Sequence, residues 1–381
     1  MLIAPHTLSI VTTYRCTAEC EHCCFSCSPR SRVELTPARM RDILDQASEL
    51  SSIKVAVFTG GECYMLGHEL DKLVRHATNR GFTTRTVSNA FWAPTREAAR
   101  KRLARLKDHG LKEANYSTGE QHSRFVPPER VRHAAIAAAE LGLVSIIAVD
   151  SFGDSRFNFD EFVSEPEFGE YIDAGKIILR VSPWMKFNGS RRITYTKKYL
   201  KHMENNRTAG TGCPTVLKVL GVLPNEELCV CCGLTMLQIP EMRVGSLRQQ
   251  SIKELLGKVP DDFLKVWLSL YGPDAILRYA QKLDPTIPSL GHHAHTCDVC
   301  RFVYHNKRIR QLVMDQPPPN MRDLISQYVQ SLVMPGAELD TELSARILRS
   351  GSKVTELKEI HQRTVFKRRD LSVPAPCRAC P

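Results

Sequence analysis

The sequence has no hydrophobic run long enough to span a membrane. Its longest apolar stretch, LGLVSIIAV at 141–149, is far shorter than the roughly 18 residues that a membrane span needs. The first residues also lack the basic segment and the small-residue cleavage site of a secretory signal peptide. We therefore expect a cytoplasmic protein, in which thiols stay reduced.

The sequence also lacks internal repeats, low-complexity tracts and any known RNA- or DNA-binding signature. Its net charge of +11 allows an anionic partner, but much of the excess lies in two stretches, 95–110 and 190–201, and a solvated helix face explains the first of them. A chain of 381 residues exceeds the roughly 250–300 residues that one core organises. We therefore expect more than one module.

Cysteine is what the sequence has in excess. In a reducing compartment disulfides are disfavoured, so clustered cysteines indicate metal binding or catalysis. Cys63 stands alone and fits an ordinary core position, whereas the others are grouped. The fourteen cysteines lie at positions 16, 20, 23, 24 and 27, then 63, then 213, 229, 231 and 232, then 297 and 300, and finally 377 and 380.

Up to about residue 185 the pattern predicts alternating strands and helices. One predicted helix, over 36–50, opens with Thr36 as N-cap and Pro37 at the first helical position. Repeated strand–helix units imply a parallel sheet with right-handed crossovers. Six units are too few for a closed eight-stranded barrel, so we expect an open, partial α/β barrel with its functional residues at the C-terminal ends of the strands. The predicted strands are 7–14, 53–60, 82–90, 113–119, 143–151 and 176–183.

Beyond about residue 190 the alternation stops. A polar stretch at 201–212 is typical of a linker, a cysteine-bearing region follows, and the remainder is helical in pattern. We therefore expect three parts: a barrel over 1–200, a small cysteine-rich domain over 201–305 and a helical extension over 306–381 that contains Cys377 and Cys380.

The first cysteine motif lies directly after the first predicted strand. Cys16, Cys20 and Cys23 have the spacing C-x3-C-x2-C. Three thiolates suit an iron–sulfur cube, which normally takes four cysteines. Structural zinc needs four protein ligands. Residues that can supply the fourth are Cys24, Cys27 and His22.

A second motif follows the next predicted strand. The segment Gly60-Gly61-Glu62 places two glycines where backbone can approach a ligand closely, and a carboxylate that can accept from an ammonium group. With C-x3-C-x2-C at the end of the preceding strand, this segment resembles the radical S-adenosylmethionine (radical SAM) superfamily. The resemblance covers about residues 7–185 and implies a partial (β/α)6 barrel.

The resemblance implies a cofactor set. In that family three cysteines hold a [4Fe-4S] cluster whose fourth iron chelates S-adenosylmethionine, and the glycine-glycine-glutamate segment holds its amine. Reduction, by a flavodoxin or ferredoxin, yields a 5'-deoxyadenosyl radical that takes hydrogen from an inert C–H bond. Asn89 and Ser117 match weaker motifs near S-adenosylmethionine. The sequence departs from the family at Cys63, where proline is usual, and at Thr118-Gly119, where Asp-Gly is common.

The later cysteines resemble an auxiliary-cluster domain called twitch, or SPASM in its longer form. The order is a cysteine, a β-hairpin ending in a cysteine, a Gly-x-Leu turn with a helix, and C-x2-C. This implies one auxiliary [4Fe-4S] cluster, with Cys229 or Cys232 as alternatives in the hairpin; a second cluster using Cys377 and Cys380, or a zinc ribbon, stays open. The expected ligands are Cys213, Cys231, Cys297 and Cys300.

Enzymes of this architecture often modify ribosomally made peptides, by cross-linking or by inverting an α-carbon. Inversion needs a hydrogen donor, for which Cys63 and Cys232 are the catalytic candidates, with Cys229 as a further one. The sequence shows no leader-binding domain before residue 7, which weakens the peptide interpretation and leaves a separate leader-recognition partner open. The alternatives are a small molecule such as an amino sugar, maturation of an enzyme active site and, in another class, a non-catalytic iron–sulfur or zinc protein that binds nucleic acid.

Overall fold

The computed structural model describes residues 4–151, 157–187 without 186, and 212–321 without 258, 260, 261 and 292. It also describes residues 195, 197, 200, 323, 324, 326 and 328. Most of the expected linker, the helices expected beyond 328, Cys377 and Cys380 lie outside the described residues. Within the described part, no helix is long and apolar enough to cross a membrane.

Six parallel strands form an open, curved sheet, and they occupy all six stretches predicted as strands. They pair in sequence order from β1 to β6, and β6 pairs only with β5 among the described strands, so the barrel is not closed. The α/β fold with a parallel core is confirmed. The strands are β1 (Thr7–Val11), β2 (Val55–Thr59), β3 (Thr83–Ser88), β4 (Leu111–Gly119), β5 (Val144–Ser151) and β6 (Ile177–Pro183).

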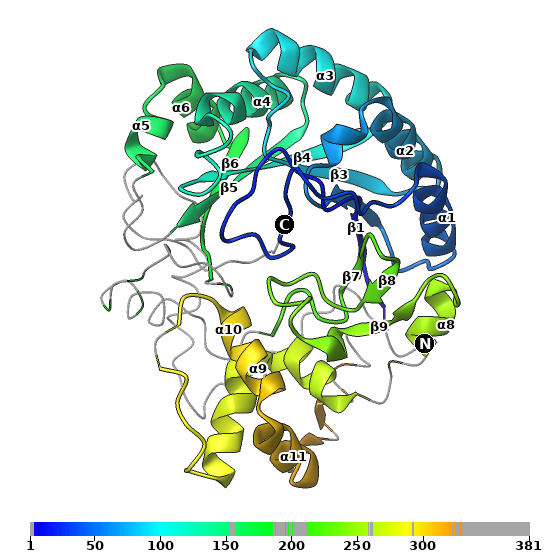
Figure 1. Cartoon of the computed structure of the whole chain (residues 1–381), viewed down its shortest axis with the longest axis vertical. Helices are drawn as coiled ribbons and strands as arrows, with labels where there is room; N and C mark the ends of the chain where they lie inside the picture. The colour runs from blue at the N-terminus through cyan, green and yellow to red at the C-terminus, as the bar shows by residue number, and fades with distance from the viewer. Residues whose placement is uncertain are drawn as a thin grey trace.

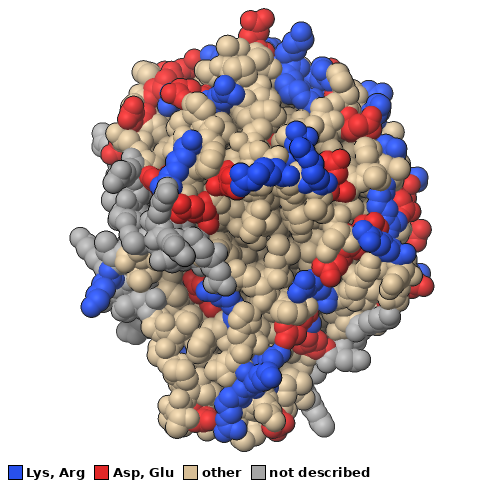
Figure 2. Space-filling view, viewed as in Figure 1, with Lys and Arg blue, Asp and Glu red and all other residues tan. Residues whose placement is uncertain are grey.

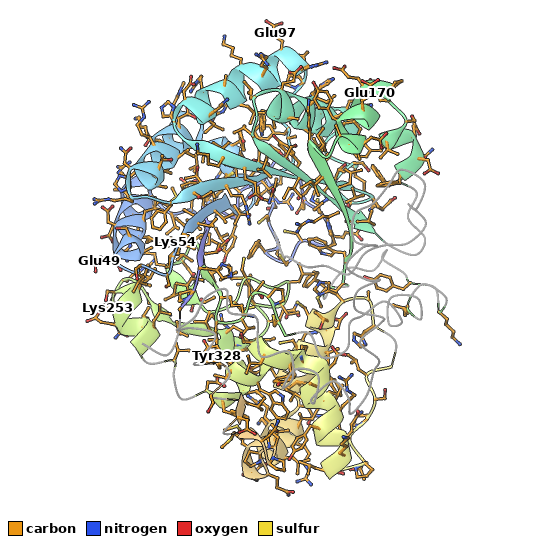
Figure 3. The ribbon with its side chains drawn as sticks, turned by 180° about the vertical axis from the view of Figure 1, so that it is seen from behind. Glu49, Lys54, Glu97, Glu170, Lys253 and Tyr328 are labelled. Carbon is orange, nitrogen blue, oxygen red and sulfur yellow. The ribbon has the colours of Figure 1, made fainter. Side chains whose placement is uncertain are left out.

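Helices cover the convex side of this sheet (Figure 1). Thr36 caps the first helix as predicted, since its hydroxyl accepts a hydrogen bond from the backbone N–H of Arg39 at 3.2 Å. Seen from behind, Glu97 and Glu170 project outward from the helical layer (Figure 3). The elements are α1 (Pro37–Ser48), η1 (Cys63–Leu66), α2 (His68–Asn79), α3 (Arg96–Asp108), α4 (Pro128–Glu140), α5 (Phe159–Val163) and α6 (Pro166–Asp173).

The strand residues alternate between two faces. Leu8 and Ile10 of β1 are fully buried and belong to the same core cluster as Met40 and Ile43 of α1. Since successive side chains point to opposite faces, Ser9 points to the concave side. Its Oγ lies 3.5 Å from Cys232 Sγ, which places that later cysteine on the concave side as well.

The C-terminal half extends the same sheet. The hairpin expected in this region is present: β7 (Val219–Val222) pairs in parallel with β1, and β8 (Glu227–Cys229) and β9 (Arg243–Ser246) follow antiparallel, so nine strands are continuous. The expected domain boundaries stay predictions. The remaining elements are η2 (Pro240–Met242), α8 (Ile252–Gly257), α9 (Phe263–Leu283, kinked at Gly272), α10 (Thr296–His305) and α11 (Lys307–Asp315).

Candidate functional site

The first cysteine motif lies on a long loop between β1 and α1. Backbone hydrogen bonds fasten the two sides of this loop together, because Tyr14 N–H donates to Val33 O at 2.9 Å and Cys16 N–H donates to Ser28 O at 3.2 Å. The loop, dark blue in Figure 1, crosses the concave side of the sheet. The fold therefore presents the cysteines at the C-terminal end of the first strand, where they were expected.

The three motif cysteines share one small cluster. Cys16 and Cys27 are buried there, and Cys20 and Cys23 pack against them. Burial raises the pKa of the Cys16 thiol to about 12, so its thiolate needs a compensating cation at neutral pH. Such a set of desolvated thiols fits a metal cluster, since ligand thiols bind as thiolates and a cation lowers their pKa.

Cys27 lies directly beside this set. Its backbone N–H donates to Cys23 Sγ at 3.4 Å. Hydrogen bonds from Cys27 lower the pKa of Cys23 to about 6, and the same contact raises the pKa of the Cys27 thiol. In this arrangement Cys27 acts on Cys23 as a hydrogen-bonding neighbour.

The two glycines of the second motif contact the cysteine loop closely. Gly61 N–H donates to Thr13 O at 2.7 Å, and Glu62 N–H donates to Arg15 O at 3.0 Å. A Cβ at Gly60, whose φ is +131°, would lie 2.6 Å from Thr13 O, and one at Gly61 would lie 2.1 Å from Arg15 O. Only glycine allows this contact. The glycines therefore make room for the chain that leads into Cys16.

Glu62 is a fully buried carboxylate at the end of β2. One oxygen accepts from Tyr64 N–H at 3.1 Å, and the other accepts from Asn89 N–H at 2.9 Å and from the Ser88 hydroxyl at 3.1 Å. Burial raises its pKa to about 7 despite these donors. A carboxylate has about four lone-pair sites, so one acceptor site remains for an additional cationic donor.

The weaker motif positions lie on the neighbouring strands. The Asn89 amide, just after β3, donates to Thr17 Oγ1 at 3.1 Å and lies 3.7 Å from Cys16 Sγ. Asn89 therefore links Glu62 to the cysteine loop. Ser117 on β4 is half-buried and lies on the face opposite to Tyr116, whose hydroxyl bonds the α4 carbonyl of Ala134; Ser117 thus faces the concave side.

A cluster that sequence reasoning missed lies beside Cys20. His22 Nε2 is 3.8 Å from Asp150 Oδ2, and His122 Nδ1 is 3.4 Å from Asp150 Oδ1, so the carboxylate at the end of β5 joins two loops. Burial lowers the pKa of His22 to about 3, which keeps it neutral, while hydrogen bonding to His122 keeps the pKa of Asp150 low. A Cβ at Gly119 would lie 1.7 Å from Asp150 Oδ1. The absence of a side chain at Gly119 therefore makes room for the Asp150 carboxylate. The aspartate that is common in the family at position 118, where this chain has Thr118, is not what makes this room.

The second cysteine set surrounds one cavity. Thr215 Oγ1 lies 3.4 Å from Cys213 Sγ and 3.6 Å from Cys231 Sγ. A Cβ at Gly233 would lie 3.2 Å from Cys231 Sγ and 3.4 Å from Cys297 Sγ. The four cysteines that the sequence analysis expects as auxiliary-cluster ligands all line this cavity. They are Cys213, Cys231, Cys297 and Cys300.

The other cysteines of the described residues do not line that cavity. Cys229 is fully buried in the core opposite Gly221. Cys63 is also fully buried in the core, where its thiol lies 3.4 Å from Val87 O, a position that fits packing. Cys232 contacts Ser9 on the concave side, and Cys24 packs near Trp184 and Cys297 between the two cysteine sets.

Comparison with known proteins defines the class. Residues 10–118 match the family model of the Radical SAM superfamily. The matched segment runs from β1 to β4 and includes Cys16, Cys20, Cys23, Glu62 and Asn89. Residues 10–118 are thus a radical SAM domain, and the resemblance read from the sequence is confirmed for this part of the chain.

Two particular proteins are similar to it. The putative peptide biosynthesis protein YydG of Bacillus subtilis (strain 168) is 27% identical over 127 residues, which are 33% of this chain and 40% of YydG, so the match spans less than half of that relative. The S-adenosylmethionine-bound crystal structure of SuiB from Streptococcus suis superposes with a TM-score of 0.50 at 15% identity, over 67% of this chain and 66% of SuiB. The second likeness concerns the fold alone.

Proposed function

We propose that this chain is a radical SAM enzyme that modifies a ribosomally made peptide, by forming a cross-link or by inverting an α-carbon. The observation that carries the proposal is the presence of two separate cysteine sets, one beside Glu62 and one around an internal cavity. One continuous sheet connects the two parts of the chain that carry them. The similarity to YydG, which is named as a putative peptide biosynthesis protein, supports a peptide as substrate.

The first set would hold a [4Fe-4S] cluster through Cys16, Cys20 and Cys23. When bound, the cluster and S-adenosylmethionine supply a 5'-deoxyadenosyl radical that removes a hydrogen atom from a C–H bond. Glu62 would accept the amine of S-adenosylmethionine at its remaining lone pair, and Asn89 holds both Glu62 and the cysteine loop in place. Ser117 lies on the same concave side, where it would contact S-adenosylmethionine.

The second set would hold an auxiliary [4Fe-4S] cluster. Burial raises the pKa of Cys231 and of Cys300, and the neighbouring thiols raise both further. Four such thiols around one cavity suit a cluster with a full cysteine set. In cross-linking, this site would accept the electron that the substrate loses; flavodoxin or ferredoxin is the external reductant we expect.

For inversion, Cys232 is the hydrogen donor that we favour over Cys63. Its thiol contacts Ser9 on the concave side, whereas Cys63 is enclosed in the core. Cys232 would give its S–H hydrogen atom to the α-carbon radical of the peptide, and the resulting thiyl would regain one electron from the external reductant, flavodoxin or ferredoxin, and one proton from solvent. Because thiol hydrogen exchanges with solvent, the new C–H bond carries solvent hydrogen.

The test is coexpression of the enzyme with each short peptide encoded beside its gene, in D2O, followed by mass spectrometry of the peptide. Inversion adds one deuterium at one residue, and cross-linking removes two hydrogens. Under inversion, Cys232→Ala should stop deuterium uptake while 5'-deoxyadenosine still forms, and Cys63→Ala should behave as wild type.

Other outcomes separate the alternatives. Unchanged peptides together with S-adenosylmethionine cleavage that depends on an amino sugar would overturn the peptide proposal. Absence of any 5'-deoxyadenosine from the reconstituted, reduced enzyme would overturn the radical activity itself, and zinc in place of iron would point to a structural role for the cysteines.

A further inference from the structure

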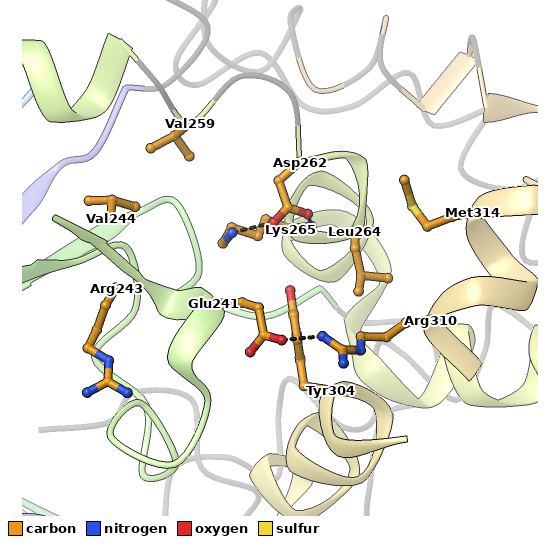
Figure 4. Close-up of a pocket in the computed structure, with 10 residues that line it drawn as sticks. All are labelled: Glu241, Arg243, Val244, Val259, Asp262, Leu264, Lys265, Tyr304, Arg310 and Met314. Atoms are coloured by element: carbon orange, nitrogen blue, oxygen red, sulfur yellow. Dashed lines mark hydrogen bonds and ion pairs between the residues drawn. The ribbon is translucent and has the colours of Figure 1, made fainter. Parts of the chain in front are cut away.

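An open pocket of about 500 Å³ lies in the C-terminal half and shares no lining residue with the cavity of the second cysteine set. Its walls come from η2, the first residues of β9, the start of α9, and α10 and α11 (Figure 4). The apolar part of the lining consists of Val244, Val259, Leu264 and Met314, of which Met314 is 53% exposed. A pocket of this size is in the range of ligand sites. We call it the α9 pocket.

Each cation of the α9 pocket already has a carboxylate partner, which for Arg243 is Glu227, outside the lining. Arg310 pairs with Glu241, and Lys265 pairs with Asp262, as the dashed lines in Figure 4 show. A phosphate or another strong anion would have to break one of these pairs. The pocket therefore favours a ligand that is neutral along most of its length.

Two polar groups of the α9 pocket lack an acceptor among the described residues, the hydroxyl of Tyr304 and Nε of Arg310. Tyr304 on α10 is only 2% exposed, and among the described residues its hydroxyl has no hydrogen-bond partner. Figure 4 shows this hydroxyl pointing toward the start of α9. A buried hydroxyl without a partner costs free energy. A ligand carbonyl at this place would remove that cost.

The α9 pocket also adjoins a sheet edge. β9 is the last strand in the pairing order, and its first two residues, Arg243 and Val244, line the pocket. An edge strand presents backbone N–H and C=O groups that can pair with an added strand. An extended peptide offers backbone groups that can pair with the edge strand and with the Tyr304 hydroxyl. It also offers side chains that can pack against the apolar wall.

We propose that the α9 pocket binds a short extended segment of the peptide substrate, outside the residue that reacts. The Tyr304 hydroxyl donates to a peptide carbonyl, and Val244, Leu264 and Met314 contact an apolar side chain. This inference rests on the proposed function for its ligand class. It assigns substrate recognition to the C-terminal half of the chain.

The test uses the full chain reconstituted with iron and sulfide. A phage-displayed library of random short peptides is selected on the wild type, and the most enriched sequence is synthesised with a fluorescent label for anisotropy titration. Tyr304→Phe removes only the hydroxyl and should weaken binding about three- to tenfold, the range for one neutral hydrogen bond. Met314→Trp, at an exposed position, should narrow the pocket and weaken binding by about tenfold or more.

Tyr279→Phe is the matched control, because it removes a hydroxyl on α9 from a side chain that does not line the pocket. Its affinity should equal that of the wild type. Equal affinities for Tyr304→Phe, Met314→Trp and wild type, or no enrichment of any peptide, would overturn the docking proposal. Iron content and thermal melting of each variant show that the fold is intact.

The two proposals fail in different ways. If coexpressed peptides are modified with the same KM by wild type and Tyr304→Phe, the docking site is wrong and the peptide-modifying function stands. If peptide binding depends on the α9 pocket but no S-adenosylmethionine is cleaved, the docking site stands and the enzymatic function fails.

Discussion

At the residue scale, Glu62 has the clearest electrostatic signature. Burial raises its pKa from 4.5 to about 7, so the folded chain binds this proton more tightly than the unfolded chain does. The contribution of Glu62 to stability therefore falls as the pH rises from 4.5 to about 7, and above that range the buried charge costs free energy. An ammonium group beside the carboxylate offsets this cost, so ligand binding and ionisation are linked.

The first prediction at this scale concerns Glu62→Gln. In wild type, affinity for S-adenosylmethionine should rise as the pH increases through about 7, because the ionised carboxylate then meets the ammonium group. Glu62→Gln should lose about 10- to 100-fold in affinity above that pH, the range for a hydrogen bond to a charged group, and its binding should no longer rise with pH. Isothermal titration calorimetry across this range measures both effects. Variant curves that coincide with wild type at every pH would disprove the assignment.

At the scale of elements, the contact between the end of β2 and the cysteine loop decides whether the site forms. Gly61→Ala would bring a Cβ to 2.1 Å from Arg15 O, which is backbone and cannot rotate away. The loop must shift, at a cost of about 1–3 kcal/mol, and its three thiols lose their arrangement. We expect the variant to lose the iron of the first site and the S-adenosylmethionine cleavage that depends on it.

Gly257→Ala is the control for this prediction, since nothing lies within 4 Å of a Cβ there. Iron analysis of both variants after reconstitution, with 5'-deoxyadenosine as the second readout, checks the expectation. Full iron content and full cleavage in Gly61→Ala would show that the loop tolerates the displacement.

The elements also show how far sequence reasoning reaches. Each of the six strands and the cap at Thr36 carry local signals, and all were predicted. The glycines were predicted to admit a ligand, whereas the structure places the backbone of Thr13 and Arg15 against them. Those neighbours belong to the loop that follows β1, and the composition of β2 carries no trace of them.

At the scale of the whole molecule, two arrangements depend on tertiary proximity alone. His22, His122 and Asp150 meet although His122 and Asp150 lie 100 and 128 positions after His22, and nothing in the sequence pairs the three. Likewise, nothing in the hairpin pattern of β7 and β8 predicts that β7 pairs with β1 and continues the barrel sheet. This pairing joins the two cysteine sets in one rigid sheet.

The mixture of charges across the visible face bears on the nucleic-acid alternative. Figure 2 shows basic and acidic side chains interspersed over this face. On α2 and α3, Arg102 and Arg105 both pair with the buried carboxylate of Asp71, and Arg96 pairs with Glu140. Basic residues of the stretch 95–110 are thus engaged within the protein, which agrees with a solvated helix face.

The hairpin cysteines provide the prediction that tests the molecule as a whole. Cys229 and Cys231 are two residues apart, yet Cys229 packs in the core opposite Gly221 and Cys231 lines the cavity with three other thiols. If the cavity holds an auxiliary cluster, reconstituted wild type should contain about eight irons, and Cys231→Ala and Cys16→Ala about four each. Cys229→Ala should keep about eight and lose only stability, by about 1 kcal/mol or more, because it removes buried atoms from the core.

Iron analysis and EPR of the reduced proteins distinguish these results. A Cys16→Ala variant that retains a reducible cluster signal, lost again on adding Cys231→Ala, would show two independent clusters. Loss of iron in Cys229→Ala with retention in Cys231→Ala would move the ligand from Cys231 to Cys229 and, with it, the site that accepts the substrate electron.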